Sequence, residues 1–106
     1  MTNTPKLLAE GQVPAIKGTL YTVPANTKAI IRTVTFANVA ATTEIVNLYV
    51  KQSGGTSRRI SRAQISINEF AHEEDIGTLE PGDEIEAYTT NATSVDYTVH
   101  GVEQTT

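Results

Sequence analysis

The sequence predicts an all-β protein: a single antiparallel β-sandwich of about seven or eight strands, of the jelly-roll or immunoglobulin-like type, with an N-terminal arm. Thr is the commonest residue with seventeen copies, and Val and Ile are plentiful. These β-branched side chains favour the pleated surface of a strand over a helix. Turn-forming residues interrupt the chain at short intervals, which is typical of a sandwich or barrel. The clear turns are 24–26, 53–55, 81–83 and 91–92.

Length and composition set the scale of the protein. The chain has 106 residues, which is enough for one domain with one modest core. Hydrophobic residues make up 39%, as in an ordinary folded domain. The absence of cysteine excludes disulfides, thiolate metal sites and cysteine nucleophiles. No apolar run approaches the roughly 20 residues of a membrane span, and the N-terminus lacks the pattern of a secretory signal, so we expect no membrane partner.

Each expected element follows from local pattern. Residues 1–10 are expected to form the arm and 11–106 the sandwich, although 6–10 could also be an edge strand. Residues 69–75 are polar and predict a loop or a single helical turn. Strands over 83–90 and 94–102 are predicted to form a hairpin around 91–93. The remaining strands are expected at 15–23, 28–39, 44–52 and, as one or two short strands, 57–67.

Two strands differ in how regular their alternation is. Val46, Leu48 and Val50 alternate with polar or amphipathic residues, which marks a strand with one buried face. In the segment 28–39, the charged Arg32 falls on the same face as Ile30 and other apolar residues. Either a β-bulge near Arg32 or an Arg32 that reaches out to a partner would explain this break.

Charge is unevenly distributed along the chain. The net charge is −4, which argues against nucleic-acid binding. All eight Lys and Arg lie between Lys6 and Arg62, whereas ten of the twelve Asp and Glu lie from Glu69 onward. The fold could mix these charges by interleaving distant strands, or it could present a two-signed surface that meets complementary neighbours in an assembly.

Catalytic patterns are weak throughout. His72 begins a His-Glu-Glu-Asp run, but the second histidine of a zinc protease motif is missing. His100 lies on the polar face of a late strand, and no serine occupies a nucleophile-elbow motif. Glu84 and Glu86 share one strand face but lack the aromatic cleft of a glycosidase. We therefore expect no enzyme, no catalytic residue, no cofactor and no metal ion, while cation binding within 69–86 stays open.

Candidate interface residues are of two kinds. Leu7 and Leu8 lie in the expected arm, where exposed apolar side chains favour docking onto a neighbouring molecule. Basic side chains could contact an acidic partner surface, which could be the acidic half of a second copy. These basic candidates are Arg32, Arg58, Arg59 and Arg62.

Three segments of the sequence resemble segments of a known protein family. The stretch LYTVPANTKAIIR at 20–32, with a strand running on to Asn38, resembles a recurrent phrase of small bacteriophage virion proteins. The turn LEPGDEI at 79–85 and the ending YTVHGVE at 97–103 are similar to later parts of the same proteins. The resemblance covers roughly 7–103 and rests on turns and strands, with no catalytic signature.

The resemblance implies a β-sandwich that decorates a phage head or forms part of a tail. We therefore expect a structural protein of the virion, assembled in the host cytoplasm. It would be a head decoration (cement) protein that stabilises the capsid by contacts with the major capsid protein or other virion proteins. We expect a homo-oligomer, with a trimer favoured. The alternative is a tail-associated receptor- or carbohydrate-binding module, in which exposed tyrosines would stack on sugar rings.

Overall fold

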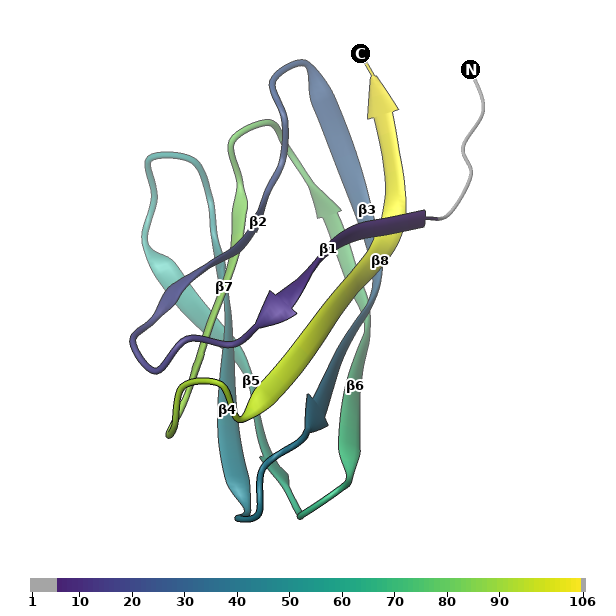
Figure 1. Cartoon of the computed structure of the whole chain (residues 1–106). Helices are drawn as coiled ribbons and strands as arrows, with labels where there is room; N and C mark the ends of the chain where they lie inside the picture. Colours follow the sequence, from purple (N-terminus) through teal and green to yellow (C-terminus); the bar gives the residue numbers. More distant parts are fainter. Residues whose placement is uncertain (1–5, 106) are drawn as a thin grey trace.

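The computed structural model describes residues 6–105, and they form eight strands (Figure 1). Within this range there is no helix long and apolar enough to cross a membrane. The all-β sandwich predicted from the sequence is confirmed. Its strands are β1 (Lys6–Gln12), β2 (Gly18–Thr22), β3 (Thr27–Asn38), β4 (Glu44–Lys51), β5 (Ser57–Ile65), β6 (Phe70–Leu79), β7 (Glu84–Thr89) and β8 (Val95–Thr105).

The strand order is that of a jelly roll. One sheet has the order β1-β8-β3-β6 and the other the order β2-β7-β4-β5. The antiparallel pairs β1–β8, β2–β7, β3–β6 and β4–β5 nest inside one another, so the chain behaves like one long hairpin wrapped into two layers. This order selects the jelly roll over the immunoglobulin-like alternative. It also leaves β1, β2, β5 and β6 as sheet edges.

The core lies between the two sheets and is built from alternate residues of the strands. Phe36, Ile31 and Leu48 are among the largest fully buried side chains. Val46 and Leu48 face inward as their alternation predicts, and Val50 packs partly buried against them. Burial of such side chains contributes roughly 1.5–3 kcal/mol each, which stabilises the pairing of the layers.

The break in alternation at Arg32 is a β-bulge. The register of β3 shifts between Ile31 and Thr33. Against β8, Arg32 is the extra residue and its side chain is exposed, whereas against β6 the extra residue lies on β6, within 75–76. On the neighbouring strand, Gly101 faces the bulge. A Cβ atom at Gly101 would lie 2.2 Å from the Ile30 carbonyl oxygen, so only glycine fits opposite this bulge.

Two predicted elements were wrong. Residues 69–75 are not a loop or helical turn, because β6 begins at Phe70. Its charged side chains are compatible with a strand because β6 is a sheet edge. Strands β7 and β8 do not form a hairpin, because they belong to different sheets. The segment 90–94 crosses between the layers instead.

The predicted boundary at residue 10 falls inside β1. Residues Lys6–Gln12 pair with β8 over nearly their whole length, so this part of the expected arm is an edge strand of the sandwich. Its backbone groups on one side pair with β8, and its other side is a free edge of the sheet. Residues 1–5 lie outside the described residues.

The turn at 80–83 is held by one aspartate. Gly82 has φ +85°, which suits glycine. The Asp83 carboxylate accepts hydrogen bonds from the backbone N–H groups of Ser53 and Glu80, both at 2.9 Å. Asp83 therefore connects this turn to the β4–β5 loop. This contact explains why the LEPGDEI segment at 79–85 has an aspartate after its glycine.

Candidate interaction surfaces

Exposed apolar side chains gather at one end of the sandwich, which we call the apolar end. It comprises the loops 13–17, 39–43, 66–69 and 90–94 together with Phe70; in Figure 1, loops 39–43 and 66–69 lie at the bottom, and loops 90–94 and 13–17 lie higher, on the left. Among the described residues, six large hydrophobic side chains are exposed, and four of them belong to this end. They are Ile16 (83% exposed), Val39 (55%), Ile67 (49%) and Phe70 (61%).

Backbone hydrogen bonds connect these loops and the strand ends beside them. The Val13 backbone N–H donates to the Val95 carbonyl at 2.8 Å, and the Thr89 backbone N–H donates to the Pro14 carbonyl at 2.9 Å. These bonds connect loop 13–17 with the strand ends on either side of loop 90–94. The Val39 backbone N–H donates to the Ser94 carbonyl at 2.9 Å, which connects loop 90–94 with loop 39–43. The Asn38 backbone N–H donates to the Glu69 carbonyl at 2.9 Å, which connects β3 with loop 66–69.

Two buried polar side chains hold the apolar end in shape. The Asn38 Nδ2 donates to the carbonyls of Thr42 and Ile65, at 2.8 and 2.9 Å, and its Oδ1 accepts from the Ala40 backbone N–H. Asn38 therefore fixes two loops, which explains the Asn at the end of the long strand. The Glu44 side chain is fully buried and supports the loops from the other sheet.

Hydrogen-bond donors around the Glu44 carboxylate offset the cost of burying its charge. It accepts from the Asn91 side chain (2.9 Å), the Asn91 backbone N–H (3.2 Å), the Thr42 hydroxyl (2.9 Å) and the Thr89 hydroxyl (3.3 Å). The bond from the Asn91 side chain is the largest influence that holds the pKa of Glu44 below its ordinary value, although burial opposes it. No sequence pattern pointed to this residue, because its partners lie in two distant loops.

The leucines proposed for the interface both lie on β1. Leu7 is 45% exposed, whereas Leu8 is partly buried and packs against the core. Leu8 is the extra residue of a bulge between Leu7 and Ala9, and Leu8 and Ala9 both pack against the core while Leu7 does not. The pair therefore does not form one apolar patch.

The arginines proposed for the interface do not form a single cluster either. Arg59 and Arg62 project on the outer face of β5, beside Tyr49 and Asn47 in the register with β4. Arg58 pairs with Val50 and lies on the opposite side of the strand, while Arg32 is on the other sheet. All four are exposed.

The outer face of the β2-β7-β4-β5 sheet carries an aromatic pair. The Tyr49 and Tyr88 rings stack with centroids 6.0 Å apart, and the Lys17 Nζ lies 4.6 Å from the Tyr49 ring centroid. Arg59 donates to the Asn47 amide oxygen at 3.4 Å beside them. A hydrogen bond with Tyr88 raises the pKa of Tyr49. Sequence alternation placed Tyr49 outward, but the pairing with Tyr88 needed the β4–β7 register.

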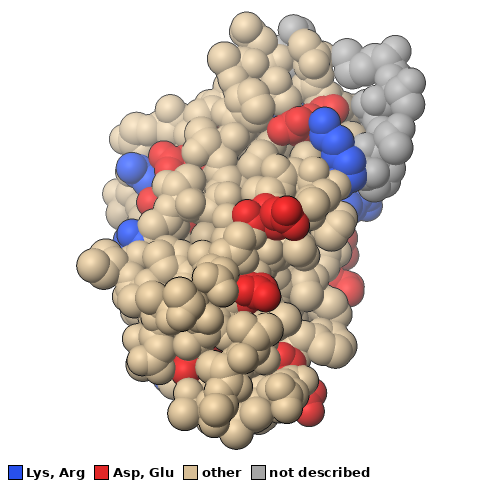
Figure 2. All heavy atoms as spheres, in the orientation of Figure 1, with Lys and Arg blue, Asp and Glu red and all other residues tan. Residues whose placement is uncertain are grey.

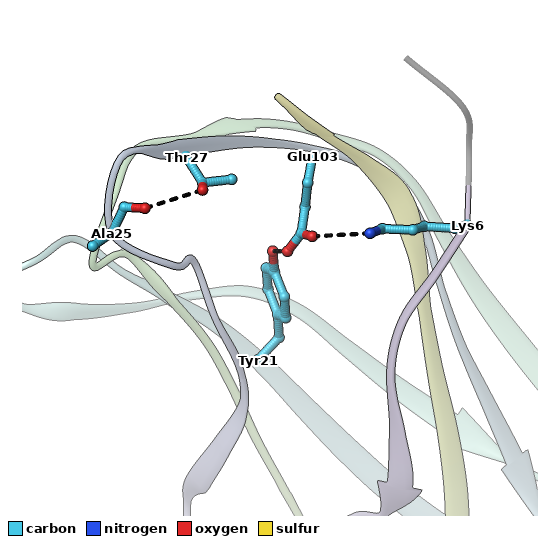
Figure 3. Close-up of polar contacts among 5 residues, drawn as sticks. All are labelled: Lys6, Tyr21, Ala25, Thr27 and Glu103. Atoms are coloured by element: carbon cyan, nitrogen blue, oxygen red, sulfur yellow. Dashed lines mark hydrogen bonds and ion pairs between the residues drawn. The ribbon is translucent and has the colours of Figure 1, made fainter. Parts of the chain in front are cut away.

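The other two tyrosines are structural. Tyr21 and Tyr97 are buried, and burial is the main cause that raises the pKa of each hydroxyl. The Tyr21 hydroxyl donates to Glu103 at 2.5 Å, and Glu103 forms an ion pair with Lys6 at 3.3 Å (Figure 3). These contacts join β2 of one sheet to β8 and β1 of the other, as the labelled side chains in Figure 3 show.

The histidine and carboxylate candidates are dispersed. Along β6, His72 and Glu74 alternate with Glu73, and the His72 Nδ1 lies 2.9 Å from the Thr35 hydroxyl. No three metal-ligating side chains come together within residues 6–105. A shallow hollow of about 420 Å³ lies between β1 and β8, where Tyr97 is buried and Asp96 exposed, and neither histidine lines it. His100 pairs with Leu7 and Thr33 on neighbouring strands.

Comparison with known proteins supports the fold. No protein-family model and no curated protein matches the sequence. A solved structure described as "Bacillus endospore appendages form a novel family of disulfide-linked pili" matches with TM-score 0.61 and 12% identity, over 98% of this chain and 88% of that chain. "Crystal structure of PirA" matches with TM-score 0.51 and 12% identity, over 96% and 95% of the two chains.

These two likenesses show the sandwich fold alone, because the identities are low. A third match, to the structure of infectious bursal disease virus Gt strain, has TM-score 0.46, 8% identity and coverage of 95% of this chain and 32% of that chain, and no argument rests on it. Since this chain contains no cysteine, disulfide linkage of the kind named for the pili is closed to it.

Proposed function

We propose that this chain is a structural protein of a bacteriophage virion: a head decoration protein that stabilises the capsid through contacts with the major capsid protein. It acts without making or breaking bonds, and it joins the virion during assembly in the host cytoplasm. The observation that supports this best is the apolar end, where Ile16, Val39, Ile67 and Phe70 are exposed on connected loops. The phage-like strand and turn phrases support the same role.

Covering the apolar end would contribute favourable free energy to docking. Full burial of one such side chain contributes roughly 1.5–3 kcal/mol, so covering four partly exposed ones yields on the order of 5 kcal/mol before the costs of association. Apolar side chains exposed together on one surface are typical of protein-binding sites. Asn38 and Glu44 keep the loops in one conformation, which lowers the entropy lost on binding.

The test is binding of the purified protein to capsids that lack it. We expect the Ile67→Ser/Phe70→Ser variant to bind at least about 100-fold more weakly, which is roughly 2.7 kcal/mol. Its thermal unfolding should change little, because both side chains are exposed. Leu7→Ser is the control, because Leu7 is similarly exposed but lies on β1.

Unchanged binding of the double variant, or a larger loss with Leu7→Ser, would reject the apolar end as the capsid contact. Mass spectrometry of virions then measures the copy number of the protein, which distinguishes a location on the head from one in the tail. A copy number near that of the major capsid protein indicates decoration, whereas a few copies indicate a tail protein.

The stacked tyrosines favour a second candidate, a tail-associated module that binds a carbohydrate receptor. Tyr88 and Tyr49 offer aromatic surface, and Arg59 and Asn47 offer hydrogen-bonding groups beside it. In this case a glycan array should retain the protein, and Tyr88→Ala should weaken retention at least about tenfold. Tyr88→Phe keeps the ring and should retain most binding. An array without any retained glycan would count against this function.

A further inference from the structure

The topology mixes most of the opposite charges but leaves a basic and an acidic strand at the sheet edges. The acidic second half of the chain supplies β7 and β8, and each lies between two strands of the basic first half. The two ion pairs found among the described residues, Lys6–Glu103 and Lys28–Glu80, join the two halves. Figure 2 shows a face with acidic side chains spread across it and basic ones at its margins. Strands β5 and β6 are edges of the two different sheets, and they lie next to each other on one side of the sandwich, where the Ser61 hydroxyl of β5 contacts Glu73 of β6.

The two edges carry opposite charges. Strand β5 carries the three arginines, and β6 carries Glu73, Glu74 and Asp75. Arg58, Arg62, Glu74 and Asp75 are exposed, and none makes an ion pair or side-chain hydrogen bond within residues 6–105. The other two are engaged within the chain: Glu73 accepts a hydrogen bond from the Ser61 hydroxyl of β5, and Arg59 donates one to the Asn47 amide oxygen.

The edges also have unused contact surface. Strand β5 pairs only with β4, and β6 pairs only with β3, so each has one side with no strand partner among the described residues. Ile60, the extra residue of a bulge in β5, is 47% exposed at this edge. An edge strand with a free side is a template for contact with another chain.

We propose that the basic edge β5 of one copy docks against the acidic edge β6 of a second copy. Like charges disfavour contact of β5 with β5 or of β6 with β6, while opposite charges favour contact of β5 with β6, so the charge pattern selects the second copy and its orientation. This contact would be the interface of the homo-oligomer that the sequence predicts. This surface adjoins the apolar end, because Phe70 begins β6. Self-association is measured without capsids and with variants that leave Ile67 and Phe70 unchanged, so it can fail or succeed independently of the proposed function.

The test is sedimentation velocity of the purified chain over a range of concentrations. Two variants each change the charge of one edge: Arg58→Glu/Arg62→Glu reverses two charges on β5, and Glu74→Lys/Asp75→Asn reverses one charge and removes another on β6. Asn is used because Asp75 has φ +53°, a conformation that Asn tolerates. Circular dichroism and thermal unfolding confirm that each variant folds. The control is Lys17→Glu/Lys28→Glu, which changes the net charge as much as the β5 variant but away from both edges.

We expect the wild-type protein to form a dimer or closed ring whose association weakens as salt screens the charges. Each edge variant alone should associate at least about tenfold more weakly, and an equal mixture of the two should associate again, because one intact β5–β6 contact remains per pair. The control should behave like wild type. A monomeric wild-type protein, unchanged association of the edge variants, or a mixture that stays monomeric would overturn the proposal.

Discussion

Replacing Gly101 by alanine is expected to lower the free energy of unfolding by about 3 kcal/mol or more, because the new methyl group meets backbone and not a flexible side chain. The nearest atoms are the Ile30 carbonyl oxygen at 2.2 Å, the Ile30 carbonyl carbon at 3.1 Å and the Ile31 Cα at 3.2 Å. Relief would require β3 and β8 to separate, and these two strands form the centre of their sheet. Thermal unfolding followed by circular dichroism measures the effect, which corresponds to a fall in Tm of at least about 12 °C.

Gly54→Ala is the matched control for this substitution. Gly54 has φ +71°, but no heavy atom lies within 4 Å of a Cβ built there. The control therefore measures the cost of the backbone conformation alone, about 1–2 kcal/mol. Equal losses for the two variants would show that the bulge at Arg32 does not press on Gly101.

Replacing Glu44 by glutamine is expected to lower the free energy of unfolding at neutral pH by about 1–3 kcal/mol. Three donors around Glu44 depend on it as their acceptor: the Asn91 side chain, the Asn91 backbone N–H and the Thr42 hydroxyl. The amide of glutamine would bring two N–H groups of its own against them. Because Glu44 joins β4 to the 90–94 loop, the loss should also loosen the apolar end. Chemical denaturation measures the stability, and hydrogen exchange of loop 90–94 measures the loosening.

The pH dependence provides an independent check. Since the pKa of Glu44 is lowered in the folded state, its contribution is fully present above the ordinary glutamate pKa of 4.5 and is lost as the pH falls through the lowered folded value. The stability difference between wild type and Glu44→Gln should therefore shrink below about pH 4. Glu74→Gln, at an exposed site without a partner, should match wild type at neutral pH. A difference between wild type and Glu44→Gln that stays constant with pH would contradict this role.

The candidate surfaces could not be predicted from the pattern of neighbouring residues in the sequence. Arg58, Arg59 and Arg62 are neighbours in sequence, yet strand alternation and a bulge at Ile60 place them on two sides of β5. Tyr49 and Tyr88 are far apart in sequence, and they meet only because β4 pairs with β7. The apolar end combines loops from four separate connections, so no stretch of sequence contains it.

The sequence by itself determined the strand content, the outward or inward direction of residues such as Val46 and Leu48, the bulge at Arg32 as one of two alternatives, and the turn at Gly82. These features depend on side-chain alternation and backbone preferences within a few residues. The tertiary structure alone decided that β7 and β8 part into different sheets, that β6 is a strand despite its charges, and that a basic edge lies beside an acidic one. Those outcomes depend on which distant strands pair, and strand pairing follows from the packing of the whole core rather than from any local stretch of residues.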